Sequence, residues 1–286
     1  MAKRTKYPIH PDFKRWENLN PPLKRAMIPV MQGLMGLLYK QEKSTAELTV
    51  ERKTIPVEAG TIRALWYCPR SVSDISPCLV VYHGGGFVLP ATPYHYSLAK
   101  EYAQRAKCKV LFVDYRLAPK NPFPIPPEDC YAAYSWVITH AEEFGIDPAR
   151  VAVTGDSAGG QLATVVCLMA KDRGQIMPCG QMLIYPAAGD VETESVKKYT
   201  DTPCATAGIW ISTGNTTVPT QPSATMFMPH PSKRRAWRDC RLHISKRRSS
   251  TVCGTAVFST GRSCAALAFL WSCTIPRGLS MALTLS

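Results

Sequence analysis

The chain has 286 residues, of which 45% are hydrophobic and 19% charged, a composition typical of a globular domain with a sizeable buried core. Its apolar stretches are too short and interrupted to span a bilayer, and the basic start at 1–6 lacks the apolar segment of a secretory signal. A membrane-spanning protein is therefore excluded, and we expect a cytoplasmic location. The 11 cysteines show neither paired nor metal-type spacing, so we expect reduced structural thiols and no metal.

The net charge of +13 is unevenly distributed along the chain. Residues 1–200 hold 24 basic and 19 acidic residues, a balance of +5, whereas residues 201–286 hold 10 basic and 2 acidic residues, a balance of +8. Most of the charge excess therefore belongs to the last third of the chain. Nucleic-acid binding, which a strongly basic protein suggests, would be a property of that tail and not of the patterned part.

The pattern of apolar residues predicts a helical segment followed by an α/β domain. Short amphipathic helices are expected over 7–41, and two strands joined by Ala59-Gly60 are expected to form a hairpin over 46–68. Strands are then expected over 79–82, 109–114, 151–154 and 182–185, alternating with helices over 97–107, 128–144 and 158–171. Short apolar strands separated by helices predict a mostly parallel sheet covered on both faces.

The strongest chemical signal is the run Gly155-Asp156-Ser157-Ala158-Gly159-Gly160, which follows a predicted strand and opens a predicted helix. A nucleophilic serine at such a turn needs small neighbours, because the backbone must fold sharply there. The short motif alone also occurs by chance in ordinary glycine-rich turns. Its place between strand and helix indicates that Ser157 is a catalytic nucleophile.

A second signal, His83-Gly84-Gly85-Gly86-Phe87, ends the strand predicted over 79–82 and precedes Ser157. Glycines let backbone N–H groups approach a developing oxyanion, and each such donor typically stabilises a transition state by about 3 kcal/mol. We expect the N–H groups of Gly84, Gly85 and Ala158 to form an oxyanion hole.

Together these motifs resemble the bacterial hormone-sensitive-lipase-like family of α/β-hydrolases, over about residues 55–203. The segment Asp114–Pro119, with Phe123-Pro124 and Glu128-Asp129, is similar to the family's brace for the oxyanion loop. The resemblance implies an α/β-hydrolase fold with an N-terminal helical cap and a carboxylesterase or lipase activity that needs no cofactor. It also implies structural roles for His83 and Asp156, and a small-molecule ester with a short to medium acyl chain as substrate.

The family's triad base and acid, which follow the serine in segments resembling His-Gly-Phe and Asp-x-Leu-x-Asp, are missing from this chain. The histidines after Ser157 are His230 and His243, and neither lies in a recognisable loop at a strand end. A serine hydroxyl is a poor nucleophile unless a histidine accepts its proton. We therefore expect the chain as it stands to be nearly inactive.

The abrupt change in composition near residue 204 suggests a shifted reading frame. Cys204-Ala205-Thr206-Ala207 can be coded TGT GCA ACA GCG, and an A restored in front gives ATG TGC AAC AGC. In that other frame, 244–256 can read Ile-Glu-Thr-Ala-Glu-Phe-Asp-Cys-Leu-Arg-Asp-Gly, and 280–284 can read His-Gly-Phe-Asp. Both missing segments thus appear in the expected order, which leads to the hypothesis that one base was lost, by sequencing error or by mutation.

The sequence therefore divides into a helical cap segment over 1–45, an α/β-hydrolase core over 46–203 and an unpatterned tail over 204–286. Two alternatives remain beside the esterase interpretation. One is a catalytically dead hydrolase-fold protein that binds a ligand. The other is a nucleic-acid-binding tail, suggested by the basic runs at 233–235 and 246–248, although a shifted frame explains those runs as well. The oligomeric state and the natural ester are not indicated.

Overall fold

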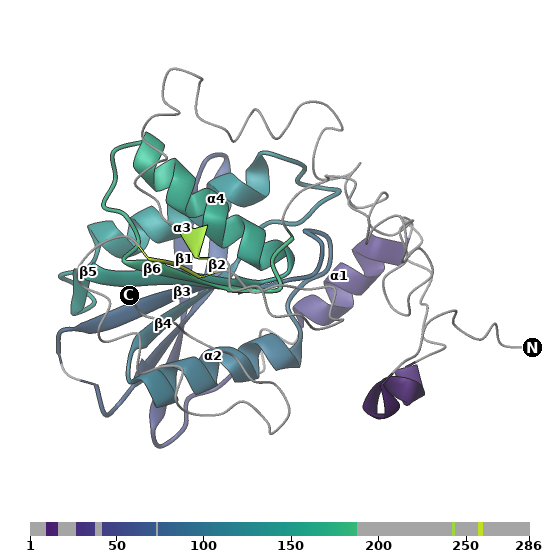
Figure 1. Ribbon diagram of the computed structural model, residues 1–286, viewed down its shortest axis with the longest axis horizontal. Coiled ribbons are helices and arrows are strands. Elements are labelled where there is room, and N and C mark those ends of the chain that lie inside the picture. The colour runs from purple at the N-terminus through teal and green to yellow at the C-terminus, as the bar shows by residue number, and fades with distance from the viewer. Residues whose placement is uncertain are drawn as a thin grey trace, which may run out of the picture.

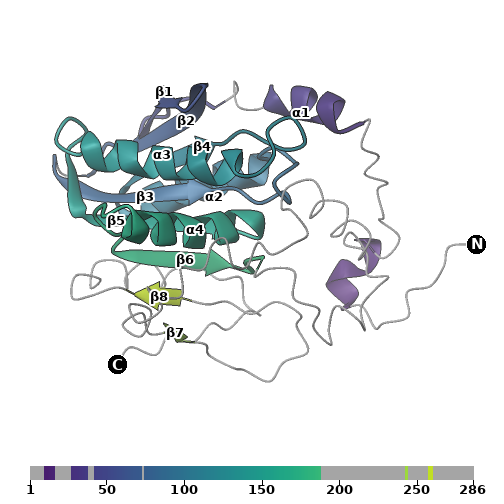
Figure 2. The same ribbon diagram turned by 90° about the horizontal axis from the view of Figure 1, so that it is seen from above.

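The computed structural model describes residues 10–16, 27–37, 42–72, 74–187, 242–243 and 257–259. Its centre is one sheet with the strand order β1-β2-β4-β3-β5-β6-β8-β7, which Figure 2 shows edge to edge. The four middle strands, β4 (Lys109–Asp114), β3 (Ser76–Tyr82), β5 (Ile146–Asp156) and β6 (Gly180–Ile184), are parallel. This confirms the predicted α/β architecture.

The first two strands form the predicted hairpin at one side of the sheet. β1 (Leu48–Val57) pairs antiparallel with β2 (Gly60–Pro69). The turn between them consists of Glu58 and Ala59, one residue earlier than predicted, because Gly60 already pairs with Val57. Ala59 and Gly60 have φ angles of 57° and 139°. β2 in turn pairs antiparallel with β4, so the parallel centre is extended by an antiparallel margin.

Helices cover both faces of the sheet. Successive side chains of a strand point to opposite faces, and both sets are apolar here, so each face needs a cover. Cys78, Val80 and Tyr82 of β3 pack with α3 (Ile125–Thr139) and α4 (Ala158–Asp172) on one face. Leu79 and Val81 point to the other face and pack with α2 (Pro93–Ala106). Figure 1 shows α3 and α4 above the sheet and α2 below it.

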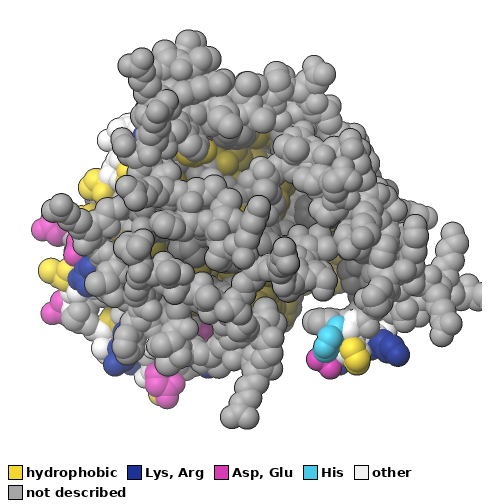
Figure 3. Space-filling view, viewed as in Figure 1, with side chains coloured by type: hydrophobic (Ala, Val, Ile, Leu, Met, Phe, Trp, Pro, Cys, Tyr) yellow, Lys and Arg dark blue, Asp and Glu magenta, His cyan; other side chains and the backbone are white. Residues whose placement is uncertain are grey.

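The N-terminal segment contributes a 3-10 helix η1 (Pro11–Trp16) and a helix α1 (Ile28–Gly36). α1 contacts the loops that follow β3 and β4, since the side-chain amide of Gln32 donates to the carbonyl oxygens of Val88 and Ala118 at 2.7 and 2.8 Å. Helix α1 therefore lies at the carboxyl edge of the parallel strands, where α/β proteins hold their ligands. On the face seen in Figure 3, described acidic and basic side chains are interspersed.

The tail predicted as unpatterned lies largely outside the described residues. Within it the structure places two short strands that the sequence analysis did not predict, β7 (Leu242–His243) and β8 (Val257–Ser259). β8 pairs antiparallel with β6 and with β7, at the other side of the sheet from the hairpin. No helix in the described ranges is long and apolar enough to cross a membrane.

A buried ion pair fastens the segment after β4 to α3. Asp129 is fully buried and accepts hydrogen bonds from the Arg116 backbone N–H at 3.0 Å and from its guanidinium at 2.6 Å. The segment Asp114–Pro119, predicted to brace the oxyanion loop, is thus tied to the core through the fully buried carboxylate of Asp129.

Replacing this carboxylate is expected to destabilise the fold strongly. Asp129→Ala leaves the Arg116 charge without its buried partner, and we expect the free energy of unfolding to fall by about 3 kcal/mol in urea titrations. Glu128→Ala is the matched control, because Glu128 pairs with Arg173 at an exposed site and its loss should cost about 1 kcal/mol or less. Equal losses in the two variants would contradict this role for Asp129.

Candidate active site

Ser157 lies at the sharp turn between β5 and α4, as predicted. Its φ of 51° and ψ of −117° are unusual for a residue with a side chain, and such strain persists only where the surroundings impose it. The Ser157 N–H donates to the carbonyl of Ile184 at 2.9 Å, and the Ser157 carbonyl accepts from the Ala187 N–H at 2.9 Å. The end of β6 therefore fixes the turn on one side.

Glycines allow this turn to press against the neighbouring strand. A Cβ atom on Gly159 would overlap the backbone carbonyl of Tyr82 at the end of β3, and a Cβ on Gly155 would overlap the backbone of Gly159. The first turn of α4 consequently lies directly beside the loop that begins at His83.

That loop is fastened to the serine turn through Asp156. The Gly84 N–H, predicted as an oxyanion donor, donates to Asp156 Oδ1 at 2.9 Å. No described hydrogen bond uses the N–H of Gly85 or of Gly86, the next two donors along the loop. Ala158 begins α4, where the first N–H groups of a helix lack partners within the helix.

His83, for which the sequence predicted a structural role, contacts the loop through hydrogen bonds and ring packing. Its ring is fully buried, stacks on Tyr115 with centroids 4.4 Å apart, and donates through Nδ1 to the Gly84 carbonyl at 2.7 Å. The Tyr115 hydroxyl donates to the His83 carbonyl at 2.7 Å. His83 Nε2 has no partner among the described residues, so the ring is neutral.

Burial lowers the pKa of His83 to about 4, below the value of about 6.5 that it has when unfolded. The unfolded chain therefore binds a proton between pH 6.5 and pH 4 that the folded chain does not. We expect the free energy of unfolding to fall by about 3 kcal/mol as the pH falls through this window, measured by urea unfolding. His83→Phe keeps an aromatic ring and removes the titration, so an unchanged pH slope in that variant would contradict the assignment.

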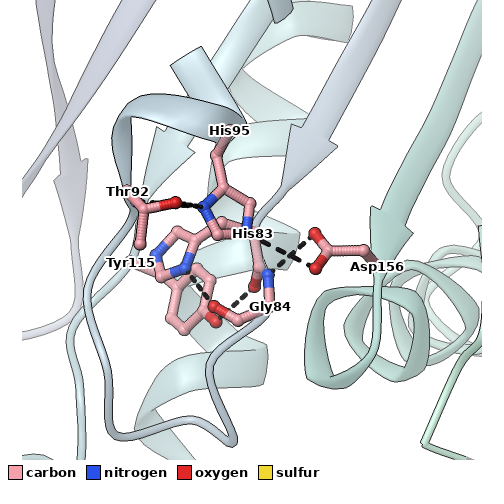
Figure 4. Close-up of polar contacts among 6 residues, drawn as sticks. All are labelled: His83, Gly84, Thr92, His95, Tyr115 and Asp156. Atoms are coloured by element: carbon pink, nitrogen blue, oxygen red, sulfur yellow. Dashed lines mark hydrogen bonds and ion pairs between the residues drawn. The ribbon is translucent and has the colours of Figure 1, made fainter. Parts of the chain in front are cut away.

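A further pair of residues, which the sequence analysis missed, completes the surroundings of Asp156 (Figure 4). His95 Nε2 lies 3.4 Å from Asp156 Oδ2, and His95 Nδ1 accepts from the Thr92 N–H at 3.0 Å. Burial by itself raises the pKa of Asp156, but the bonds from His95 and Gly84 outweigh burial and hold that pKa below its ordinary value. The signal in the sequence was a threonine three residues before a histidine at the start of a helix.

Among the residues that the structure describes, no base is placed beside the serine. No hydrogen bond within the described ranges joins the Ser157 side chain to a histidine. His230 lies outside the described residues, and His243 is described only as part of β7. In the described part of the chain, His, Cys, Asp and Glu side chains also form no group of three that could hold a metal ion.

A strained serine between a parallel strand and a helix, beside a glycine loop at the end of the preceding parallel strand, defines the hydrolase class of α/β proteins. The chain belongs to the alpha/beta hydrolase fold family, whose model matches residues 79–234. The predicted resemblance and fold class are thereby confirmed.

The relatives of the chain are esterases and lipases. It is 47% identical over 138 residues to the carboxylic ester hydrolase LipN of Mycobacterium tuberculosis, which is 46% of this chain and 36% of LipN. It is 39% identical over 180 residues to the carboxylesterase NlhH of the same species, covering 62% of this chain and 56% of NlhH. The matches thus span between about a third and just over half of these relatives.

Solved structures agree with this relationship. A hyperthermophilic esterase from the archaeon Pyrobaculum calidifontis superposes with a TM-score of 0.64 at 32% identity, covering 77% of this chain and 73% of that one.

A longer relative in sequence is human hormone-sensitive lipase. It is 33% identical over 181 residues, which are 63% of this chain and 16% of the lipase.

Proposed function

We propose that this protein, in its intact reading frame, is a serine carboxylic-ester hydrolase for small esters with short to medium acyl chains. Ser157 attacks the ester carbonyl, an acyl-enzyme forms as the alcohol leaves, and water releases the acid, so that neither a metal nor an organic cofactor takes part. The observation that carries the proposal is the strained φ of 51° at Ser157, because a serine strained in this way, half-buried at a helix start beside a glycine loop, is typical of a hydrolase nucleophile.

The oxyanion of the tetrahedral intermediate would be held by backbone N–H groups. Because the Gly84 N–H already donates to Asp156, its proposed role becomes the fastening of the loop, and the donors are those of Gly85, Gly86 and Ala158. One such donor typically stabilises the transition state by about 3 kcal/mol, so these N–H groups together would supply a large part of the rate enhancement.

The triad acid and base are proposed to lie in the reading frame that restoring one base before the Cys204 codon would open. In the coding given above for that frame, the first aspartate of the acid segment would be encoded across Ser250 and Thr251, and the histidine of His-Gly-Phe-Asp across Ser280 and Met281. The core over 46–203 would thus be followed by evolved C-terminal elements in place of the tail over 204–286.

A second candidate is a hydrolase-fold protein that binds an ester without cleaving it. It is favoured by one observation, that no described hydrogen bond links Ser157 to a histidine. This candidate predicts binding without turnover in both reading frames.

Hydrolysis of p-nitrophenyl acetate and butyrate tests the proposal. We expect the frame-restored protein to cleave both esters and its Ser157→Ala variant to lose activity by at least about 10⁴-fold. Turnover that survives Ser157→Ala would refute Ser157 as the nucleophile, and binding of the esters without turnover would support the second candidate.

A further inference from the structure

His95 stands at the start of α2, where it closes a capping arrangement with Thr92. The Thr92 N–H donates to His95 Nδ1 at 3.0 Å, and the His95 N–H bonds back to the Thr92 carbonyl at 3.0 Å. A backbone N–H can only donate, so Nδ1 is the acceptor and the proton of the neutral ring is on Nε2. The cap therefore selects the tautomer of the ring.

With the proton on Nε2, the ring directs a donor at Asp156. Nε2 lies 3.4 Å from Asp156 Oδ2, and both side chains are only 12% exposed, so water competes little for this contact. The other oxygen, Oδ1, accepts the Gly84 N–H at 2.9 Å. Each carboxylate oxygen of Asp156 thus has a partner of its own, one on helix α2 and one on the glycine loop (Figure 4).

Asp156 is bonded covalently to Ser157, and Gly84 is bonded covalently to Gly85. The carboxylate consequently couples the position of the nucleophile to the position of the next loop donors. Without the bond from His95, one carboxylate oxygen loses its partner and the side chain is free to turn away from the Gly84 N–H.

We propose that His95 is a positioning residue, which holds the Asp156 carboxylate so that the serine turn and the oxyanion loop keep their relative placement. Only the predicted effect of His95 on the rate of hydrolysis rests on the proposed function. If His95 had a purely structural role, it would act only by capping the start of α2 together with Thr92, and its contact with Asp156 would not matter.

Two amide variants separate these roles. In His95→Asn, the side-chain oxygen can take the place of Nδ1 and keep the cap, but the side chain is too short to reach Asp156. In His95→Gln, the longer amide can place its N–H near the position of Nε2. Because both residues are neutral, neither adds a charge beside Asp156.

The first measurement is a ¹³C NMR titration of the Asp156 carboxyl in the full 286-residue chain. We expect wild type and His95→Gln to show a pKa below the ordinary aspartate value and His95→Asn to show a clearly higher pKa. An unchanged pKa in His95→Asn would overturn the proposal.

The second measurement is p-nitrophenyl butyrate hydrolysis by the frame-restored protein. We expect His95→Asn to lower kcat by about 10- to 100-fold with little change in KM, and His95→Gln to recover most of that loss. Equal kcat values in His95→Asn and wild type would contradict the proposal. If the restored wild type has no activity, the proposed function fails, while the titration still decides the role of His95.

Discussion

Restoring one base before the codon for Cys204 is expected to raise esterase activity by about four to six orders of magnitude. The reason is that a serine without its histidine and aspartate retains only the contributions of the oxyanion hole and of substrate binding. The measurement is kcat/KM for p-nitrophenyl butyrate in the 286-residue chain and in the restored protein, purified in parallel.

The Ser157→Ala variants of both proteins are the controls for this comparison. They should be equally inactive, since the nucleophile is common to the two chains. If the 286-residue chain already turns over at the rate of the restored protein and depends on Ser157, its own tail supplies a base. His230 or His243 would then be the residue to test, and the frame hypothesis would be wrong.

Gly159→Ala is expected to lower both stability and rate strongly, because it adds a methyl group where two backbone segments of the site approach most closely. The added methyl group would overlap the carbonyl of Tyr82 and lie close to the backbone carbon of His83, and neither can give way as a flexible side chain could. We expect the free energy of unfolding in urea to fall by about 3 kcal/mol or more. In the restored protein, kcat should fall by about 100-fold as the serine turn moves away from the loop.

Gly33→Ala is the matched control for this substitution. Gly33 lies inside α1, and a Cβ built there meets no atom within 4 Å. Alanine favours a helix over glycine by about 1 kcal/mol, so this variant should be neutral or slightly stabilised. Comparable destabilisation in both variants would contradict the steric account of Gly159.

Much of the fold follows from patterns that act over short distances in the sequence. The apolar run after Cys108 predicts β4, and the structure begins and ends that strand at the predicted residues, Lys109 and Asp114. The start of α3 was missed by three residues: the helix begins at Ile125 and includes Pro126 and Pro127. Proline is tolerated in a first helical turn, where its missing N–H would have no partner in any case.

The network around Asp156 could not be predicted in the same way. His95 and Asp156 are 61 residues apart, and only the adjacency of parallel β3 and β5 brings the segments that carry them together. Whether the Gly84 N–H points at a substrate or at Asp156 depends on one backbone orientation and one side-chain rotamer. Neither feature affects the periodicity or composition of the sequence. The glycine motif therefore predicted the loop, but not which of its backbone N–H groups are free to bind an oxyanion.

The most direct test of the central claim is to trap the acyl-enzyme on Ser157. The frame-restored protein is mixed with p-nitrophenyl butyrate, quenched in acid within milliseconds to seconds, digested and examined by mass spectrometry. Our account predicts a butyryl group on the peptide that carries Ser157 and none on that peptide from the Ser157→Ala variant. A butyryl group on another residue that decays at the rate of turnover, with Ser157 unmodified, would contradict it.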